Sequence, residues 1–403
     1  MTARDRILIA SRLAARQCMK LFWVFPVQRN KILFESFEGK SYSCNPKYLS
    51  EYLEMNHPGE FKLVWSFVLP EDHSGLAGQH PIRIVRKRSL RWYYEYLTAG
   101  VRITNAASLL SYFPKRKNQL VINTWHAGGA YKRTGIVSEY VEANSDFKKW
   151  RRREQANLFN LFLSSSPVFT ETNIRSAYWY TGKVLNCGMP RNDLFFDADR
   201  IRACSEKAKS CLGISGFTVL YAPTYRGGTQ NTLALPPAPL EAIAAGVRER
   251  FGCTPTILVR GHYLMAQNNL AEAGNRPPGL HIVDATKYPD MQELLCAADM
   301  LVTDYSSSIW DYALVGRPCF LYVPDLEEYT SSDRGFFTPI QEWPGIICPD
   351  REALFSAICN LDEEFCRQKA EQHLRAFQSY EQGKACEMTS QTIRHFVQTG
   401  ETD

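Results

Sequence analysis

The sequence has 403 residues, of which 45% are hydrophobic and 22% are charged, and its formal net charge is +5. This length is enough for two domains or one bilobal unit with a large core. The mild positive charge favours anionic ligands, but it is too small to indicate a nucleic-acid-binding protein. The twelve cysteines are scattered, without a C-x-x-C pair or a zinc-like spacing, so we expect a reducing, cytoplasmic compartment and no metal site.

The first 27 residues differ from the rest because residues 4–26, RDRILIASRLAARQCMKLFWVFP, interleave basic and bulky apolar side chains. Arg12 and Arg16 interrupt any apolar region of a secretory signal peptide, and no stretch reaches the roughly 20 apolar residues of a membrane span. We expect residues 1–27 to form a basic amphipathic helix on an anionic membrane surface, which would place the protein on the inner face of the cell membrane. The alternative is an ordinary first helix that packs on its own domain.

From residue 31 onward, short apolar runs alternate with helical patterns, which is typical of parallel α/β layers. Strands are predicted at residues 31–36, 62–68, 82–85, 101–104, 120–125, 158–166 and 184–188, and then at 217–224, 256–261, 280–284, 299–303 and 318–323. Helices are predicted at residues 45–55, 89–99 and 238–252, followed by a helical tail over 351–397. Asn45 is the predicted N-cap of the first of these helices, and Gly252 ends the third.

The domain boundary is predicted at a helix with a Gly/Ser exit, residues 196–216. This predicts an α/β protein with two Rossmann-like doubly wound domains, residues 28–200 and residues 201–403, the second including the helical tail. Two such domains facing across a cleft would bind a ligand at the carboxyl ends of their strands. Asp197 and Asp199 resemble a metal-binding D-x-D, but their position favours acids at a helix start.

Small polar residues follow the predicted strand 299–303. Residues 301–325, LVTDYSSSIWDYALVGRPCFLYVPD, place Asp304 and the hydroxyls of Ser306, Ser307 and Ser308 at the start of a short helix. We interpret Ser308 and Asp311 as a capping box. Free amide groups at a helix start attract anions, so this turn is also a candidate phosphate site.

A histidine follows another strand in residues 121–135, VINTWHAGGAYKRTG. Histidine titrates near neutral pH, so His126 at a strand end is a candidate general base. Gly128 and Gly129 would let the backbone approach a substrate, and Lys132 is within reach of an anion. The alternative for His126 is a structural role in the core.

Three more segments carry polar residues at strand ends or turns. Arg226 lies in residues 221–228, and a guanidinium has the fork geometry that phosphate oxygens accept. The run LVRGHYL of residues 258–264 is another predicted strand end, and it carries Arg260 and His262. Residues 187–196, CGMPRNDLFF, form a predicted rigid turn in which we interpret Arg191 and Asp193 as ties within the turn itself.

Taken together, these segments resemble the CDP-glycerol glycerophosphotransferases of teichoic acid and capsule synthesis. The matching pieces occur in the family's order at residues 32–49, 124–135, 188–193, 222–227, 259–262, 303–322 and 328–337. Two departures stand out: Ala127 follows the first histidine where the family often has glycine and threonine, and Tyr263 follows His262 where proline is common.

The resemblance implies a GT-B fold, with the acceptor on the first domain and the donor nucleotide on the second. It implies transfer of glycerol phosphate, or a related alditol phosphate, from a CDP-alditol to a lipid-linked saccharide or polyol-phosphate acceptor, with release of CMP. By resemblance, His126 and His262 are catalytic, Gly128, Gly129 and Lys132 lie on the acceptor side, and no cofactor is required. The donor-binding residues would be Arg226, Asp304, Ser306, Ser307, Ser308 and Arg334.

Three alternatives remain open on the sequence alone. The first is a GT-B glycosyltransferase that uses a UDP- or GDP-sugar, and the second is a ribitolphosphotransferase that uses CDP-ribitol. The third is a non-catalytic scaffold at the membrane surface, although a scaffold has no need of His126, Arg226 and His262.

Overall fold

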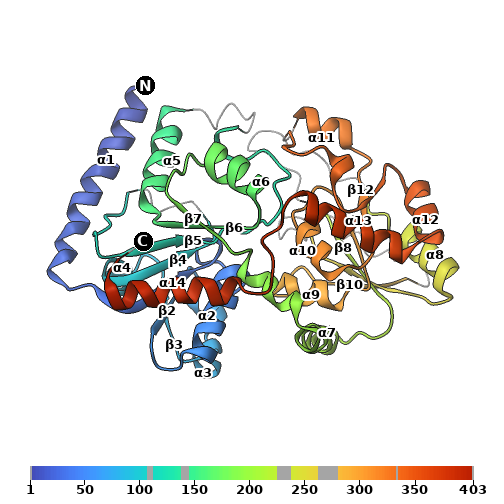
Figure 1. Ribbon diagram of the computed structural model, residues 1–403, viewed down its shortest axis with the longest axis horizontal. Coiled ribbons are helices and arrows are strands. Elements are labelled where there is room, and N and C mark those ends of the chain that lie inside the picture. The colour runs from blue at the N-terminus through green and yellow to red at the C-terminus, as the bar shows by residue number, and fades with distance from the viewer. Residues whose placement is uncertain are drawn as a thin grey trace. The chain divides into compact units, whose positions relative to one another are not determined.

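The computed structural model describes residues 2–106, 112–137, 145–224, 237–261, 280–332 and 335–401. The chain folds into two compact units, each built on a parallel sheet flanked by helices (Figure 1). Unit 1 comprises Met1–Gly128, Thr134–Asp193 and Tyr380–Asp403. Unit 2 comprises Gly129–Arg133 and Leu194–Ser379.

The sheet of unit 1 has the strand order β3-β2-β1-β4-β5-β6-β7, which is the doubly wound order of a Rossmann-like domain. Its strands are β1 (Gln28–Glu35), β2 (Lys62–Phe67), β3 (Ile82–Arg86), β4 (Ala99–Thr104), β5 (Leu120–Asn123), β6 (Leu161–Ser164) and β7 (Lys183–Asn186). Every recorded pairing in this sheet is parallel. The inner strands β4, β5 and β6 are buried along their whole length, which explains why they appear in the sequence as unbroken apolar runs.

The helices of unit 1 are α1 (Ala3–Met19), α2 (Cys44–Asn56), α3 (Leu76–Gln79), α4 (Leu90–Thr98), α5 (Asp146–Leu158), α6 (Pro167–Phe169) and α14 (Ala385–Thr399). Shorter helical turns are η1 (Lys20–Val24), η2 (Phe37–Gly39), η3 (Pro70–His73), η4 (Gly135–Val137) and the π-helix η6 (Thr170–Ala177). Helix α1 is not isolated, because Met19 at its end and Phe22 in η1 pack against the core cluster around Trp92 and Phe113.

The sheet of unit 2 repeats the same winding, with the order β10-β9-β8-β11-β12-β13. Its strands are β8 (Thr218–Ala222), β9 (Thr256–Val259), β10 (His281–Asp284), β11 (Met300–Thr303), β12 (Cys319–Tyr322) and β13 (Ile346–Cys348). Its helices are α7 (Ala198–Leu212), α8 (Leu240–Phe251), α9 (Met291–Ala297), α10 (Ser308–Val315), α11 (Leu326–Ser332), α12 (Arg351–Cys359) and α13 (Glu363–Ala376), with the short turn η9 (Ile340–Glu342). The turn η7 (Pro190–Phe196) contains the boundary between the units. The predicted strands are all present, and β13 was not predicted.

The domain limits differ from those predicted. The change of unit falls between Asp193 and Leu194 rather than at residue 200, and the last helix returns to unit 1 instead of staying with residues 201–403. Helix α14 belongs to unit 1 because it packs against α2 (Figure 1) and because Asp193 binds its first turn. The buried carboxylate of Asp193 accepts the backbone N–H groups of Ala385 and Cys386 at 2.9 and 2.7 Å, and so caps the start of α14.

Two helix starts also test the sequence interpretation. Helix α2 begins at Cys44 with Ser43 as its N-cap, so Asn45 is not the cap that was predicted, and its side chain bonds elsewhere. Helix α7 has Asp197 as its N-cap, with the side chain accepting from the N–H groups of Asp199 and Arg200, as expected of acids at a helix start. The predicted end of α8 at Gly252 is also confirmed, with the glycine at φ +67°.

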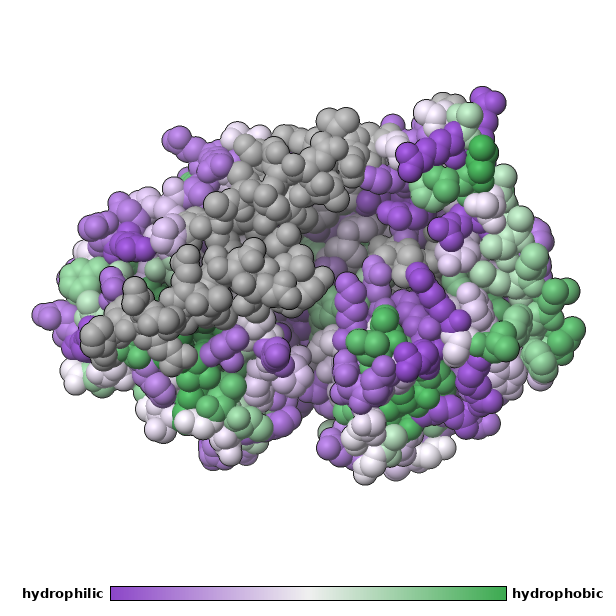
Figure 2. Space-filling model, turned by 180° about the vertical axis from the view of Figure 1, so that it is seen from behind, coloured by the Kyte–Doolittle hydropathy of each residue, from purple (hydrophilic) through white to green (hydrophobic). Residues whose placement is uncertain are grey.

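The surface alternates in polarity. On the face drawn in Figure 2, hydrophobic residues form separate patches among hydrophilic ones. Within the part of the chain that the structure describes, no helix combines the length and the apolar character that crossing a membrane would need.

Candidate functional site

In unit 1, the chain turns sharply where β5 ends. Asn123 closes the strand, and its side-chain oxygen accepts the backbone N–H of Trp125 at 2.8 Å. Trp125 has a φ of +51°, a left-handed conformation that costs a non-glycine residue about 1–3 kcal/mol. Such a conformation persists only where surrounding contacts enforce it, so this turn is a candidate functional feature. His126 follows directly.

The contacts of the His126 ring fix its tautomer. The Nδ1 atom lies 2.7 Å from the backbone carbonyl oxygen of Asn105, which follows β4. A carbonyl oxygen can only accept, so Nδ1 carries the proton and Nε2 holds the lone pair of the neutral ring. The ring is stacked on Trp125 at a centroid distance of 4.4 Å. The Phe37 ring lies 5.4 Å from it, centroid to centroid, and is tilted relative to it. His126 is therefore oriented as a proton acceptor.

The surroundings also keep this imidazole neutral. Three causes together lower the pKa of His126 to about 4. The largest is the loss of water around the ring, which lowers the pKa; the hydrogen bond to Asn105 raises it in part, and the positive charge of Arg191 makes a smaller lowering contribution. At neutral pH the ring is then uncharged, which is the form that a general base needs.

Two segments far from His126 in the sequence hold the turn that carries it. The Asn45 side-chain amide donates to the carbonyl oxygens of Thr124 and Trp125 at 3.0 and 2.8 Å. The Arg191 guanidinium donates to the carbonyl oxygen of His126 at 2.8 Å. Arg191 is thus not merely a tie within its own turn, as the sequence interpretation had it. The motif around residues 188–193 marked this arginine, but nothing in the sequence indicated its partner.

In unit 2, polar side chains meet at the carboxyl ends of β8 and β11. The Asp304 carboxylate accepts the backbone N–H of Thr224 at 2.8 Å and its hydroxyl at 2.7 Å. The next residue, Tyr305, is fully buried and stacks on Tyr329 with a centroid distance of 3.8 Å. Asp304 thereby joins the two strand ends where a Rossmann-like domain places its ligand. This structural bond is a role that the sequence did not indicate.

The serines after Asp304 lie as predicted at the start of α10, but the predicted capping box is wrong. The N-cap is Ser307, and no side chain caps the helix from that position. Ser306 instead accepts from the N–H and hydroxyl of Ser308 at 3.3 and 2.9 Å, while Asp311 accepts from the Gln292 side chain. Ser306 and Ser307 are partly exposed and Ser308 is buried, so two of the three hydroxyls are accessible to a ligand.

The residues predicted on the acceptor side divide between the units. Gly128 belongs to unit 1, where its carbonyl accepts the Ser165 hydroxyl, whereas Gly129 and Lys132 belong to unit 2. The Lys132 ammonium lies 3.4 Å from the Thr224 hydroxyl, so this cation joins the Asp304 group rather than the acceptor-side group. A β-carbon at Gly129 would stand 2.1 Å from the Tyr131 ring, so this glycine makes room for its neighbour rather than for a substrate.

The segment Gly129–Arg133, which we call the strap, is anchored in unit 2 by pairing and by one buried side chain. Lys132 forms an antiparallel bridge with Phe336, and the N–H of Arg133 donates to Gly335 at 2.9 Å. The buried Tyr131 hydroxyl lies 2.8 Å from Nε2 of His373, whose Nδ1 is 2.7 Å from the Glu342 carbonyl oxygen. That carbonyl requires a proton on Nδ1, so the Tyr131 hydroxyl donates to Nε2.

Several predicted residues cannot be placed. Arg226, His262 and Arg334 lie outside the described residues. Within the described ranges, no group of three or more His, Cys, Asp or Glu side chains is arranged to hold a metal ion.

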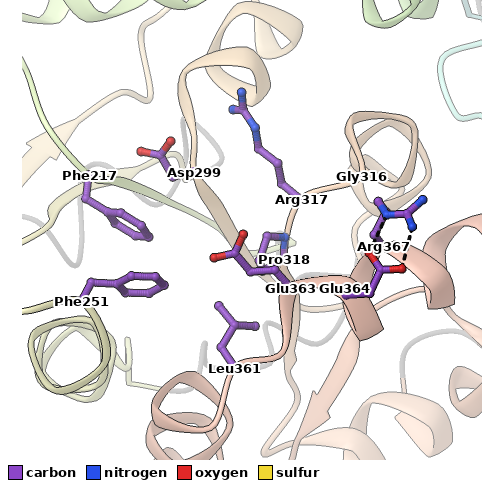
Figure 3. Close-up of a pocket in the computed structure, with 10 residues that line it drawn as sticks. All are labelled: Phe217, Phe251, Asp299, Gly316, Arg317, Pro318, Leu361, Glu363, Glu364 and Arg367. Carbon is purple, nitrogen blue, oxygen red and sulfur yellow. Dashed lines mark hydrogen bonds and ion pairs between the residues drawn. The ribbon is translucent and has the colours of Figure 1, made fainter.

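A pocket of about 490 Å³ in unit 2 lies at the amino ends of the strands, opposite the Asp304 group (Figure 3). Phe217, Asp299 and Pro318 line it, and each directly precedes a strand. Figure 3 shows the Phe217 and Phe251 rings on one side and the Glu364–Arg367 ion pair on the other. Ligands of doubly wound sheets bind at the carboxyl ends of the strands, so we do not assign the nucleotide to this pocket.

Comparison with known proteins supports the family that the motifs indicated. The family model described as CDP-glycerol:poly(glycerophosphate) glycerophosphotransferase matches residues 17–395. A teichoic acid poly(glycerol phosphate) polymerase of Bacillus subtilis is 32% identical over 83% of this chain and 44% of its own length. A protein of the same name from Bacillus spizizenii is 29% identical over 84% of this chain and 85% of its own length. The chain thus spans less than half of the first relative and most of the second.

Solved structures agree. The wall teichoic acid polymerase TagF superposes with a TM-score of 0.79 at 26% identity, covering 98% of this chain and 97% of that chain. The predicted GT-B type fold with two Rossmann-like domains is therefore confirmed. A UDP-N-acetylglucosamine 2-epimerase of Listeria monocytogenes, at 12% identity and a TM-score of 0.52, shares the fold alone. With its motifs, its two sheets and these matches, this chain belongs to the CDP-glycerol:poly(glycerophosphate) glycerophosphotransferase family.

Proposed function

We propose that this protein transfers glycerol phosphate from CDP-glycerol to a hydroxyl group of a lipid-linked or polymeric acceptor in the synthesis of a teichoic acid or a capsule-type polymer. The acceptor oxygen attacks the phosphorus distal to cytidine, the bond from that phosphorus to the bridging oxygen breaks, and CMP leaves with that oxygen. The observation that carries this proposal is the neutral imidazole of His126, held at a strand end inside a chain of this family.

His126 is the proposed general base. Its Nε2 lone pair would take the proton of the acceptor hydroxyl as the new oxygen–phosphorus bond forms. The proton on Nδ1 stays bonded to the Asn105 carbonyl throughout, which keeps the ring in one orientation. A base held in place in this way needs no reorganisation when the acceptor arrives.

The group at the strand ends of unit 2 is the proposed donor site. Phosphoryl transfer develops charge on phosphate oxygens, so fixed positive groups are the main contribution that the protein makes. Lys132 supplies a cation beside Thr224, and the accessible hydroxyls of Ser306 and Ser307 stand at the start of α10. Arg226, His262 and Arg334 are proposed to add positive charge from segments outside the described residues.

The proposal includes no metal cofactor, because cations and helix amide groups would neutralise the diphosphate. Turnover in excess EDTA should then equal turnover without it. Loss of activity in EDTA that added Mg²⁺ or Mn²⁺ restores would show that a divalent ion is part of the site.

The direct test is a product assay. Purified protein is incubated with CDP-glycerol and a short lipid-linked acceptor, and the products are identified by mass. We expect CMP and an acceptor heavier by one or more glycerol phosphate units. Nucleotide specificity can be measured separately by thermal shift, since a ligand that binds the folded protein raises its midpoint. Stabilisation by UDP but not by CMP, together with no transfer, would favour the glycosyltransferase alternative.

CDP-ribitol is the second candidate donor. A teichoic acid ribitol-phosphate primase of Bacillus spizizenii is 26% identical over 94% of this chain and 94% of its own length. The same product assay with CDP-ribitol in place of CDP-glycerol distinguishes the two, because the mass added to the acceptor differs by the two extra carbons of ribitol.

We further propose that the protein acts at the inner face of the cell membrane, held there by α1 and η1. Ile7, Leu21 and Val24 are 70%, 75% and 78% exposed, so this basic segment offers three large apolar side chains to a membrane surface. Arg4 and Arg6 are exposed on the same segment, so apolar contact with acyl chains and attraction to anionic headgroups would act together.

A further inference from the structure

The turn that carries His126 is enclosed by side chains that the reaction itself does not explain. The side-chain amide of Asn45 donates to the backbone carbonyls of Thr124 and Trp125. Its side-chain oxygen accepts the backbone N–H of Arg191 at 3.1 Å. The Arg191 guanidinium reaches back to the His126 carbonyl oxygen at 2.8 Å and to the Cys44 sulfur at 3.1 Å. These hydrogen bonds join three segments to one another: α2, the turn after β5, and η7.

Burial makes these contacts costly to break. Asn45 is fully buried and the Arg191 residue is 5% exposed, so neither side chain can replace a lost partner with bulk water. Removing a guanidinium from water costs free energy, which its hydrogen bonds must offset. Arg191 also brings a positive charge, which acts on the His126 ring.

We propose that Arg191, held by Asn45, is a positioning residue for the His126 base, because its guanidinium fixes the main chain of His126 through the carbonyl oxygen. The positive charge of Arg191 near the ring is a secondary effect that disfavours protonation of His126. The inference rests on the proposed function, because it takes His126 as the base. It adds that the PRND segment of residues 190–193 serves the chemistry at His126 rather than the boundary turn alone. The donor is assigned to residues of unit 2, so Arg191 should affect the rate and not donor affinity.

The test compares Arg191→Met with Arg175→Met. Met keeps most of the aliphatic stem and removes the guanidinium. Arg175 is the control because its guanidinium likewise makes two hydrogen bonds in the same unit, in this case to the backbone carbonyls of Tyr180 and Gly182 and away from His126. Both variants are first checked for an unchanged circular dichroism spectrum and thermal midpoint. Arg191→Lys, which keeps the charge, serves if Arg191→Met does not fold.

Three quantities are measured. For Arg191→Met we expect kcat to fall about 10- to 100-fold, as for a misplaced catalytic group, with the KM for CDP-glycerol unchanged. The pKa of His126, followed by NMR of labelled histidine without substrate, should rise, and the acid limb of kcat/KM should rise with it. Arg191→Lys should keep the His126 pKa low but recover only part of kcat, because the lysine side chain is shorter and its ammonium would not occupy the position of Nη1, which donates to both Cys44 and His126.

Two outcomes would overturn the inference. One is an Arg191→Met protein with the kcat and the His126 pKa of the parent. The other is an equal loss of kcat in Arg175→Met, which would indicate a general effect of removing an arginine tie. Failure of the proposed function is distinguishable, since the parent protein would then transfer nothing from CDP-glycerol, and failure of His126 as the base would appear as full activity of His126→Ala.

Discussion

The acid limb of the rate profile should differ from that of an ordinary histidine enzyme. The pKa of His126 is lowered to about 4, so the neutral base persists well below the usual range. At pH 6 about 99% of His126 would be neutral, against about 24% for a histidine with the unperturbed pKa of about 6.5. Activity between pH 5 and pH 7 should therefore be nearly flat where a normal histidine would lose most of it.

The assay is kcat/KM for CDP-glycerol from pH 4.5 to 8, because this ratio reports the ionisation of the free enzyme. Circular dichroism at each pH establishes that the protein stays folded. His126→Ala provides the reference, and its rate should be lower by roughly 10²–10⁴-fold without an acid limb of its own. An acid limb with a midpoint near 6.5 that disappears in His126→Ala would refute the low pKa, and full activity of His126→Ala would refute its role as base.

Three other predictions concern separate parts of the molecule. Lys132→Met should raise the KM for CDP-glycerol by about 10- to 100-fold, which is the loss expected for one charge-assisted hydrogen bond. Lys132→Arg should retain most of the affinity. Equal affinities in the two variants would remove Lys132 from the donor site. Tyr131→Phe should lower stability by about 1–3 kcal/mol, because Nε2 of the buried His373 loses its donor. Tyr93→Phe, at a partly exposed ring, should change the thermal midpoint little, and equal shifts in the two variants would contradict the proposed anchor. Replacing the exposed Ile7 and Leu21 by glutamate should reduce sedimentation with anionic vesicles, while undiminished binding would place the membrane contact elsewhere.

The sheets were predictable from the sequence because buried parallel strands appear as short apolar runs. Strands β8 and β11 are examples, since each is buried at every position and ends in polar residues. Strand β13 was missed because it has only three residues, two of them partly exposed. Helix α14, the last part of the predicted tail, was assigned to the wrong unit because the cap that Asp193 provides for it joins residues 192 or more positions apart.

The residues of the candidate site could be selected from the sequence, but their contacts could not. His126 and Asp304 were selected as candidates because each follows a strand. The partners of His126 were not, since Asn45 looks like a helix cap and Asn105 contributes only a backbone carbonyl, which has no sequence signal. Lys132 was expected on the acceptor side because it is near His126 in the sequence, whereas its pairing with Phe336 takes it into unit 2.

The strap has a practical consequence for engineering. Residues 194–379 expressed alone would lack a strand partner for Phe336 and the aromatic ring that fills the space beside His373. A hybrid that exchanges the nucleotide-binding half between two relatives would face the same defect if cut only at residue 194. Hybrids that aim to alter donor choice should therefore exchange residues 129–133 together with residues 194–379, because the two segments fold as one unit.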